Sequence, residues 1–356
     1  MTSPVYLDYN ATAPLRPEAQ EAMLEALDHV GNASSVHAFG RKARLWVEEA
    51  RKEVAKATGA EVEEVVFTSG GTEGNVAALH GLPGTSVLVS ATSHNSVLKN
   101  VTAHAFLPVH PSGLLNLEEA EKQMASAPRP FLVSAEWVNN ETGVIHPVAE
   151  LQALVKKHGG YLHLDAVQAL GKIPLTLRPD LLTLAAHKIG GPQGAGALVI
   201  REGVPFVPLI KGSHEKGRRG GTENVAGIAG FGAAVRHMTF ADAAWRDEME
   251  AQLLRVPGAR IVGQEAPRVA NTTGLVCPGL KAEILVMQLD MAGFAVSSGA
   301  ACSSGKVTVS HVLQAMQCPE SEQFSALRIS FGWKTQKIEL DSFVKSWTEL
   351  ALSAIR

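Results

Sequence analysis

An apolar run passes through one lysine into a glycine-rich turn in the stretch Leu184-Ala185-Ala186-His187-Lys188-Ile189-Gly190-Gly191-Pro192-Gln193-Gly194. Earlier in the chain, the segment His163-Leu164-Asp165-Ala166-Val167-Gln168 places an acid at the end of a second apolar run. Pyridoxal phosphate requires a lysine to hold its aldehyde and an acid to keep its ring nitrogen protonated. Asp165 and Lys188 together suggest a Schiff-base enzyme, whereas Lys188 considered alone is more simply a solvated surface lysine.

The sequence around this stretch alternates short apolar runs with helical patterns. Continuous apolar runs of four or five residues are typical of strands buried on both faces. Such alternation predicts an α/β fold, in which a mainly parallel sheet is flanked by helices. The predicted strands are 65–68, 86–90, 131–134, 161–164, 181–184 and 196–200, and the predicted helices between them include 36–58, 75–80 and 147–158.

The pattern changes in the last third of the chain. Residues 222–256 predict one long helix or two, and the segments after them predict a smaller α+β unit. Its strands are expected at 260–263, 272–276, 294–297 and 326–331, and its helices at 283–291 and 341–355. We therefore place a domain boundary near residue 240. Residues 15–240 form the expected large domain, and residues 1–14 with 241–356 form the small one.

Composition narrows the function classes. The chain has 356 residues, of which 46 % are hydrophobic and 19 % are charged, as in ordinary globular proteins. A net charge of −3 without a basic run argues against a nucleic-acid binder. Neither a signal peptide nor an apolar run of membrane-spanning length is visible. We expect a cytoplasmic protein that contacts neither nucleic acid nor membrane.

Three widely spaced cysteines, Cys277, Cys302 and Cys318, form no Cys-x-x-Cys pair. This argues against a disulfide framework and a zinc site, and it fits a reducing compartment. Cys302 differs from the other two because small residues and glycines surround it in 297–305, which indicates an exposed loop. A nearby cation, Lys306, would favour its thiolate. A lone cysteine is otherwise most often an inert core residue.

Three further segments follow predicted strands, where α/β proteins usually bind ligands. Thr68-Ser69-Gly70-Gly71-Thr72 resembles a phosphate cup, although it equally fits a capped helix start. His94 could stack on an aromatic cofactor and move protons, or it could be an ordinary loop histidine. Asn139-Asn140 could present an amide to a carboxylate, or it could form a turn.

Taken in order, these segments resemble the cysteine desulfurases of the NifS/IscS type in the class V aminotransferase family, which have the type I fold of pyridoxal-phosphate enzymes. The resemblance covers nearly the whole chain. It rests on Tyr6–Pro14, Gly31–His37, Ser69–Glu73, Asn139–Gly143, Asp165–Gln168, His187-Lys188, Gly220–Thr222, Ser297–Cys302 and Leu327–Gly332.

The resemblance implies a role for each matching residue. Lys188 would form the Schiff base with pyridoxal 5'-phosphate and move the α-proton, and Asp165 would pair with the ring nitrogen. The remaining ring contacts would come from Gln168, which would bond the ring hydroxyl, and from His94, which would stack on the ring. The phosphate would be held by Gly71, Thr72, His187 and, from the other subunit of a dimer, Thr222. The substrate carboxylate would be held by Arg328 and Asn140, and Cys302 would attack the substrate sulfur.

The implied enzyme is a sulfurtransferase that converts L-cysteine to L-alanine and keeps the sulfur as a persulfide on Cys302. It would act as a homodimer and supply sulfur to an acceptor or an iron–sulfur scaffold protein. In this scheme the small domain carries the Cys302 loop and Arg328, whose planar fork suits a carboxylate.

The sequence departs from the family pattern at several positions, and other functions remain as alternatives to a cysteine desulfurase. Ala185 stands where the family commonly has a serine for the phosphate, and Ser213, His214 and Lys216 replace the usual glycine, glutamine and arginine. The segment after Arg328 is shorter than in the housekeeping enzymes. The alternatives are a selenocysteine lyase, a class V aminotransferase without a role in sulfur transfer, and a sulfur-assembly partner that has lost catalysis.

Overall fold

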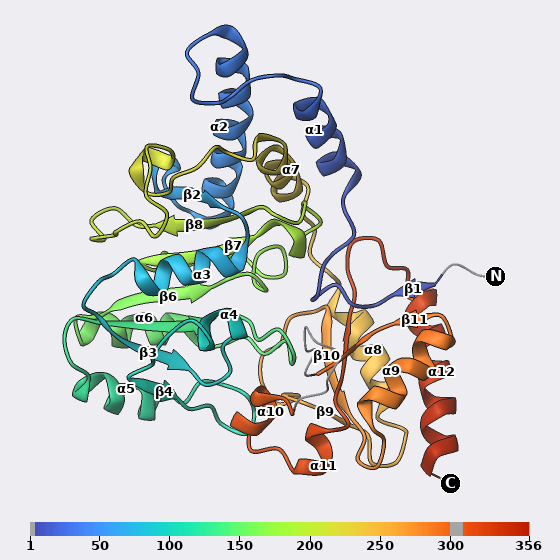
Figure 1. Cartoon of the computed structure of the whole chain (residues 1–356). Coiled ribbons are helices and arrows are strands. Elements are labelled where there is room, and N and C mark those ends of the chain that lie inside the picture. Colours follow the sequence, from blue (N-terminus) through green and yellow to red (C-terminus); the bar gives the residue numbers. More distant parts are fainter. Residues whose placement is uncertain (1–3, 300–308, 356) are drawn as a thin grey trace.

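The computed structural model describes residues 4–299 and 309–355, and its largest element is a seven-stranded sheet (Figure 1). The strand order is β2-β8-β7-β6-β5-β3-β4. Only β8 runs antiparallel to its neighbours, so the predicted mainly parallel sheet is confirmed. The strands are β2 (Val65–Thr68), β3 (Ser86–Ser90), β4 (Ala105–Leu107), β5 (Phe131–Glu136), β6 (Tyr161–Asp165), β7 (Leu181–Ala185) and β8 (Gly196–Ile200).

Helices cover both faces of this sheet, because its central strands are apolar on both sides. One face packs against α3 (Gly71–His80) and α4 (Asn95–Leu98), which lie in front of the sheet in Figure 1. The other face packs against α2, α5, α6 and α7, whose buried residues belong to the largest core cluster. The remaining bounds are α1 (Pro17–Leu27), α2 (Ala38–Thr58), α5 (Leu117–Ser126), α6 (Val148–Lys157) and α7 (Val225–Arg236).

The C-terminal third forms a separate, antiparallel four-stranded sheet of order β12-β13-β10-β9. Its core contains Phe331, Phe343 and Trp347. The first strand of the chain, β1 (Val5–Tyr6), packs here, because it pairs in parallel with β11 (Phe294–Ala295). The elements are β9 (Arg260–Ile261), β10 (Thr272–Val276), β12 (Ser297–Ser298), β13 (Leu327–Ser330), α8 (Ala243–Leu253), α9 (Ala282–Met291), α10 (His311–Ala315), α11 (Glu320–Gln323) and α12 (Lys337–Ile355).

The helical pattern over 222–256, predicted as one long helix or two, forms two helices, α7 and α8. The buried residues of α7 belong to the core of the large sheet, and those of α8 belong to the core of the small one. The strand expected at 294–297 is two short strands, β11 and β12, each paired with a different partner. The exact domain boundaries stay a prediction. Within the described residues, none of the helices is long and apolar enough to cross a membrane.

Candidate active site

A cavity of about 350 Å³ lies at the carboxyl ends of the central parallel strands. It brings together nine of the residues that the sequence singled out, from six separate segments of the chain. They are Gly71, Thr72, His94, Asn140, Asp165, Gln168, His187, Lys188 and Arg328. Thr222 is exposed and does not line the cavity of its own chain. Cys302 lies outside the described residues.

Lys188 ends a short 3-10 turn, Ala186–Lys188, which follows β7 directly. Its amine donates to the carbonyl oxygens of Asn10 at 2.6 Å and Ala11 at 2.8 Å. Burial and the nearby Arg328 guanidinium lower its pKa to about 8 from the usual 10.5. A larger share of this amine is therefore unprotonated near neutral pH than in an exposed lysine, as a nucleophilic amine requires.

Asp165 is the last residue of β6 and is buried. Its carboxylate accepts hydrogen bonds from Asn75 Nδ2 at 2.7 Å and from the amide of Val167 at 3.0 Å. In the described part of the chain, no cationic side chain lies within ion-pair distance of it, and burial raises its pKa. A buried carboxylate that has donors but no cation fits a protonated ring nitrogen as its missing partner.

His94 is the N-cap of α4, and its Nδ1 lies 2.8 Å from the hydroxyl of Ser96. Burial lowers its pKa, so the ring is held largely neutral. The ring lines the same cavity as Asp165. This position suits a flat group that stacks on a heteroaromatic ring, and it leaves the other ring nitrogen for proton transfer.

The anion cup forms where β2 meets α3. Gly70 has φ of 148°, a conformation that side chains rarely adopt, and Gly71 begins the ten-residue helix. The first amides of α3 and the hydroxyl of Thr72 therefore face the cavity with the positive end of the helix dipole. Ala185 lies beneath them, because a Cβ on Gly71 would meet its methyl group at 3.6 Å.

The amide of Gln168 has a fixed orientation. Its Nε2 donates to the carbonyl of Asn10 at 3.0 Å, and its Oε1 accepts from the amine of Lys172. The same lysine donates to Asn10 Oδ1 at 2.5 Å. The second Nε2 hydrogen therefore remains free to donate to a ring hydroxyl in the cavity.

Arg328 projects from β13 and is held by the N-terminal segment. Its Nη2 donates to Asp8 Oδ1 at 2.8 Å, and its Nη1 donates to the carbonyl of Asn140 at 3.2 Å. Its buried Nε has no partner among the described residues. An unsatisfied donor on a buried guanidinium is costly unless an acceptor binds there, and a substrate carboxylate is such an acceptor.

The cavity also contains two carboxyl groups that the sequence did not single out. Burial alone would raise the pKa of Glu136, but His146 at 3.1 Å and the hydroxyl of Thr92 lower it to about 2. Burial raises the pKa of Glu141, whose carboxyl accepts from the hydroxyl of Ser310 at 2.6 Å. Glu136 is the last residue of β5 and pairs with Asp165 at the end of the neighbouring strand β6. Its position at a strand end could therefore have identified it from the sequence as a candidate site residue.

Comparison with known proteins gives consistent relatives over nearly the whole chain. The family model described as aminotransferase class-V matches residues 5–343. A cysteine desulfurase of Cereibacter sphaeroides is 42 % identical over 96 % of this chain and 94 % of its own. The X-ray structure of a NifS-like protein from Rickettsia africae has a TM-score of 0.90 and 32 % identity, and covers 98 % of this chain and 99 % of its own. The structure of SspA in complex with cysteine has a TM-score of 0.82 and 29 % identity, over 92 % of this chain and 99 % of its own.

Proposed function

Because the chain belongs to the class-V aminotransferase family, we propose that it is a pyridoxal-phosphate-dependent cysteine desulfurase, which converts L-cysteine to L-alanine and transfers the sulfur to Cys302. The observation that carries this proposal is the pairing of two complementary groups across one cavity. Lys188 offers an amine with a lowered pKa, and Asp165 offers a buried carboxylate that lacks a cation. The amine matches the aldehyde of the cofactor, and the carboxylate matches its ring nitrogen.

The cofactor, when bound, supplies an aldehyde that captures amines and a ring that draws electrons from the substrate. Asp165 would hold the proton on the ring nitrogen, and His94 would stack on the ring. Gly71, Thr72 and the α3 amides would receive the phosphate. The pKa of His187, lowered by burial to about 4, leaves this ring neutral beside the phosphate, as a hydrogen-bond partner and not as a cation.

The substrate is oriented by its carboxylate. The guanidinium of Arg328 binds this group through Nε, and Asp8 holds the guanidinium in place through Nη2. Lys188 then takes the α-proton and returns a proton to the substrate, which its pKa of about 8 permits near neutral pH. A relative named cysteine desulfurase is 42 % identical to this chain, and the structure of SspA is in complex with cysteine, so cysteine is the proposed substrate.

The sulfur step needs no outside oxidant. The thiolate of Cys302 attacks the substrate sulfur, the bond between that sulfur and Cβ breaks, and its electrons remain on the carbon fragment. Two protons convert that fragment to L-alanine. The sum is L-cysteine plus a cysteine thiol giving L-alanine plus a cysteine persulfide, so atoms and electrons balance. Cys277 and Cys318 are buried and their thiol pKa values are raised by burial, so neither competes as the acceptor.

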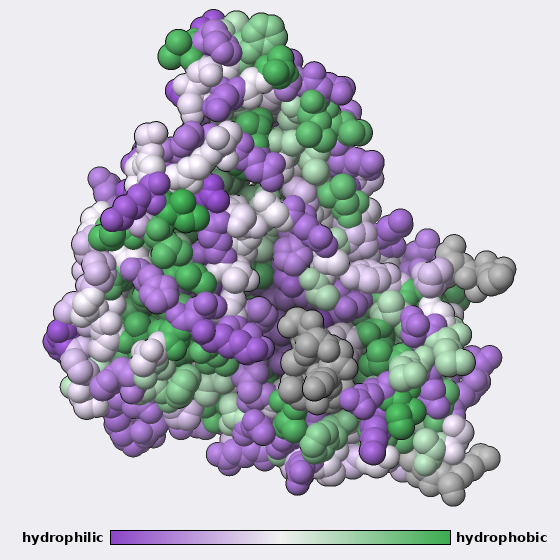
Figure 2. Space-filling model, viewed as in Figure 1, coloured by the Kyte–Doolittle hydropathy of each residue, from purple (hydrophilic) through white to green (hydrophobic). Residues whose placement is uncertain are grey.

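We infer that the active unit is a homodimer. Leu24, Leu27 and Phe39 are exposed on α1 and α2, and Figure 2 shows hydrophobic groups at this end of the molecule. Thr222 is exposed and is not among the residues that line the cavity of its own chain, as expected for a residue that completes the phosphate site of a second copy. A closed two-fold pair satisfies both features. The persulfide would pass to a sulfur acceptor or an iron–sulfur scaffold protein.

The test is incubation of the purified, cofactor-loaded protein with L-cysteine, with alanine measured over time. The proposal expects several turnovers of alanine per subunit when a thiol removes the persulfide. Lys188→Ala should make none and should lose the visible absorption of the bound cofactor. Alanine formation only from selenocysteine would replace the proposal with a lyase, and transamination without sulfur release would replace it with an aminotransferase.

A further inference from the structure

We propose that a second cavity, on the side of Lys188 away from the active site, binds a small organic carboxylate with an apolar body. The cavity has a volume of about 290 Å³, close to that of the active-site cavity. Among the described residues, Lys188 is the one that lines both. The second cavity is therefore a separate compartment, and nothing in the proposed desulfurase reaction uses it.

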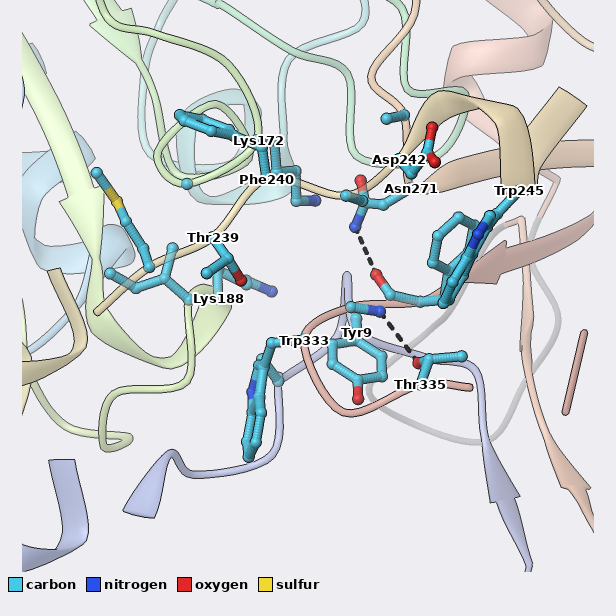
Figure 3. Close-up of a pocket in the computed structure, with 18 of the residues that line it drawn as sticks. Tyr9, Lys172, Lys188, Thr239, Phe240, Asp242, Trp245, Asn271, Trp333 and Thr335 are labelled. Carbon is cyan, nitrogen blue, oxygen red and sulfur yellow. Dashed lines mark hydrogen bonds between the residues drawn. The ribbon is translucent and has the colours of Figure 1, made fainter. Parts of the chain in front are cut away.

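Several aromatic side chains contribute to its wall. Figure 3 shows the rings of Tyr9, Phe240, Trp245 and Trp333 around the space, with the amines of Lys172 and Lys188 on one side. These rings come from the N-terminal segment, the connection before α8, α8 itself and the segment after β13. A cavity lined by aromatic and other apolar groups with a small number of polar ones is the usual composition of a small-molecule site.

Arg16 gives this cavity its charge preference. Its residue is only 7 % exposed, and no carboxylate lies within ion-pair distance of it in 4–299 or 309–355. Its Nε and Nη2 bond neutral oxygens of Ile189 at 2.9 Å and Thr239 at 3.4 Å. Its guanidinium lies 5.1 Å from the ring centre of Trp333. A buried guanidinium without a counter-ion favours an anion in the space that it lines.

A buried amine adds further donors to this cavity. Burial lowers the pKa of Lys172 well below its usual value, so the amine contributes hydrogen-bond donors and the charge preference rests on Arg16. The amine of Lys172 lines the same cavity, and its hydrogen bonds to Asn10 and Gln168 are to neutral amide oxygens. Among the described residues that line the cavity, Asp242 is the only carboxylate; it is exposed, and one of its oxygens caps α8. Within that part of the chain, the buried Arg16 guanidinium therefore has no matching anion in the interior.

The shape and chemistry together select the ligand class. A guanidinium fork binds a carboxylate with two parallel hydrogen bonds, and the surrounding rings bury an apolar body. Inorganic phosphate would satisfy the charge but would leave the aromatic wall uncovered. A neutral aromatic compound would cover the wall but would leave Arg16 without a counter-ion. A carboxylate with an aryl or alkyl body meets both requirements.

Isothermal titration calorimetry of the cofactor-loaded protein with 3-phenylpropionate tests this inference. We expect saturable binding, and at least tenfold weaker binding of the matched neutral compound 3-phenylpropionamide. Arg16→Gln should weaken 3-phenylpropionate binding at least tenfold and leave binding of the amide unchanged. Absence of saturable binding up to 10 mM, or equal affinity for inorganic phosphate, would overturn the inference.

Two further variants show whether 3-phenylpropionate binds in the second cavity or in the active-site cavity. Arg328→Gln should leave the affinity for 3-phenylpropionate unchanged, because Arg328 lines only the active-site cavity. Loss of binding in Arg328→Gln with retention in Arg16→Gln would assign the heat to the active site and overturn the inference. Trp333→Leu keeps Arg16 but removes the ring beside it, and provides the same test if Arg16→Gln does not fold. It should weaken binding about fivefold or more, and unchanged affinity would count against the proposed site.

Discussion

The pKa of Lys188 can be measured, and its value tests how burial and the neighbouring charges act on this amine. Its pKa of about 8 means that about one amine in ten is unprotonated at pH 7, against about one in three thousand for an ordinary lysine of pKa 10.5. Burial is the largest cause, and the Arg328 guanidinium is the next. The acids Asp8 and Asp165 act in the opposite direction.

Replacing Arg328 with glutamine therefore has a predictable sign. The change removes a cation that lowers the pKa of Lys188, and it frees Asp8, an anion that raises it. Both effects raise the pKa, by about one unit if the pair acts as nearby charges in proteins commonly do. A rise of one unit lowers the unprotonated share at pH 7 about tenfold.

The assay labels the cofactor-free protein with a limiting amount of an amine-selective reagent at a series of pH values. Mass spectrometry of the Lys188 peptide then gives its labelling rate against pH, with an exposed lysine such as Lys345 as the internal reference. The rate for Lys188 should rise with a midpoint near pH 8, and this midpoint should move upward in Arg328→Gln. A midpoint near that of Lys345, or a downward movement in the variant, would refute the reasoning.

Four further predictions follow from the same geometry. Arg328→Lys keeps a charge but loses the Nε donor and the fork, so kcat/KM for cysteine should fall roughly tenfold or more, and unaltered kinetics would place the carboxylate elsewhere. Ala185→Ser places a hydroxyl beneath the anion cup and should tighten cofactor binding several-fold by equilibrium dialysis; equal binding would mean that the cup is already satisfied. The pKa of Glu136 is depressed to about 2, so its stabilising contribution is present above pH 4.5 and is lost as the pH falls toward 2. The loss of unfolding free energy in acid should therefore be smaller in Glu136→Gln than in the wild type. Equal losses in the two proteins would show that the pair of Glu136 and His146 does not stabilise the fold. Analytical ultracentrifugation should find a dimer, and a fully active monomer at nanomolar concentration would contradict the shared phosphate site.

The strands of the large sheet could be predicted closely because they are buried on both faces. Three of them, β2, β3 and β8, have the predicted bounds, since a short apolar run between turn residues has few alternatives. The helix α5 was not predicted, although Asn116 caps its first turn, because its exposed face makes most of it polar. The strand β4 is three residues long at the edge of the sheet, too short for a periodic signal.

The candidate site could be predicted as a set of residues but not as a geometry. The resemblance brought His94, Asp165, Lys188 and Arg328 together, and the cavity contains all four. The contacts of Lys188 with Asn10 and of Arg328 with Asp8 depend on tertiary packing, and no local sequence pattern encodes them. Arg328 meets Asp8 from the far end of the chain, because β1 pairs with β11 and Asp8 forms a parallel bridge with Ser330.

The most direct test of the central claim locates the transferred sulfur. Protein that has been freed of persulfide is mixed with one equivalent of L-cysteine, then alkylated and digested, and the cysteine peptides are weighed. The account predicts one added sulfur on the peptide that contains Cys302, together with an equal amount of L-alanine, and almost no alanine from Cys302→Ala. Added sulfur on the Cys277 or Cys318 peptide, or alanine formation at the normal rate in Cys302→Ala, would contradict it.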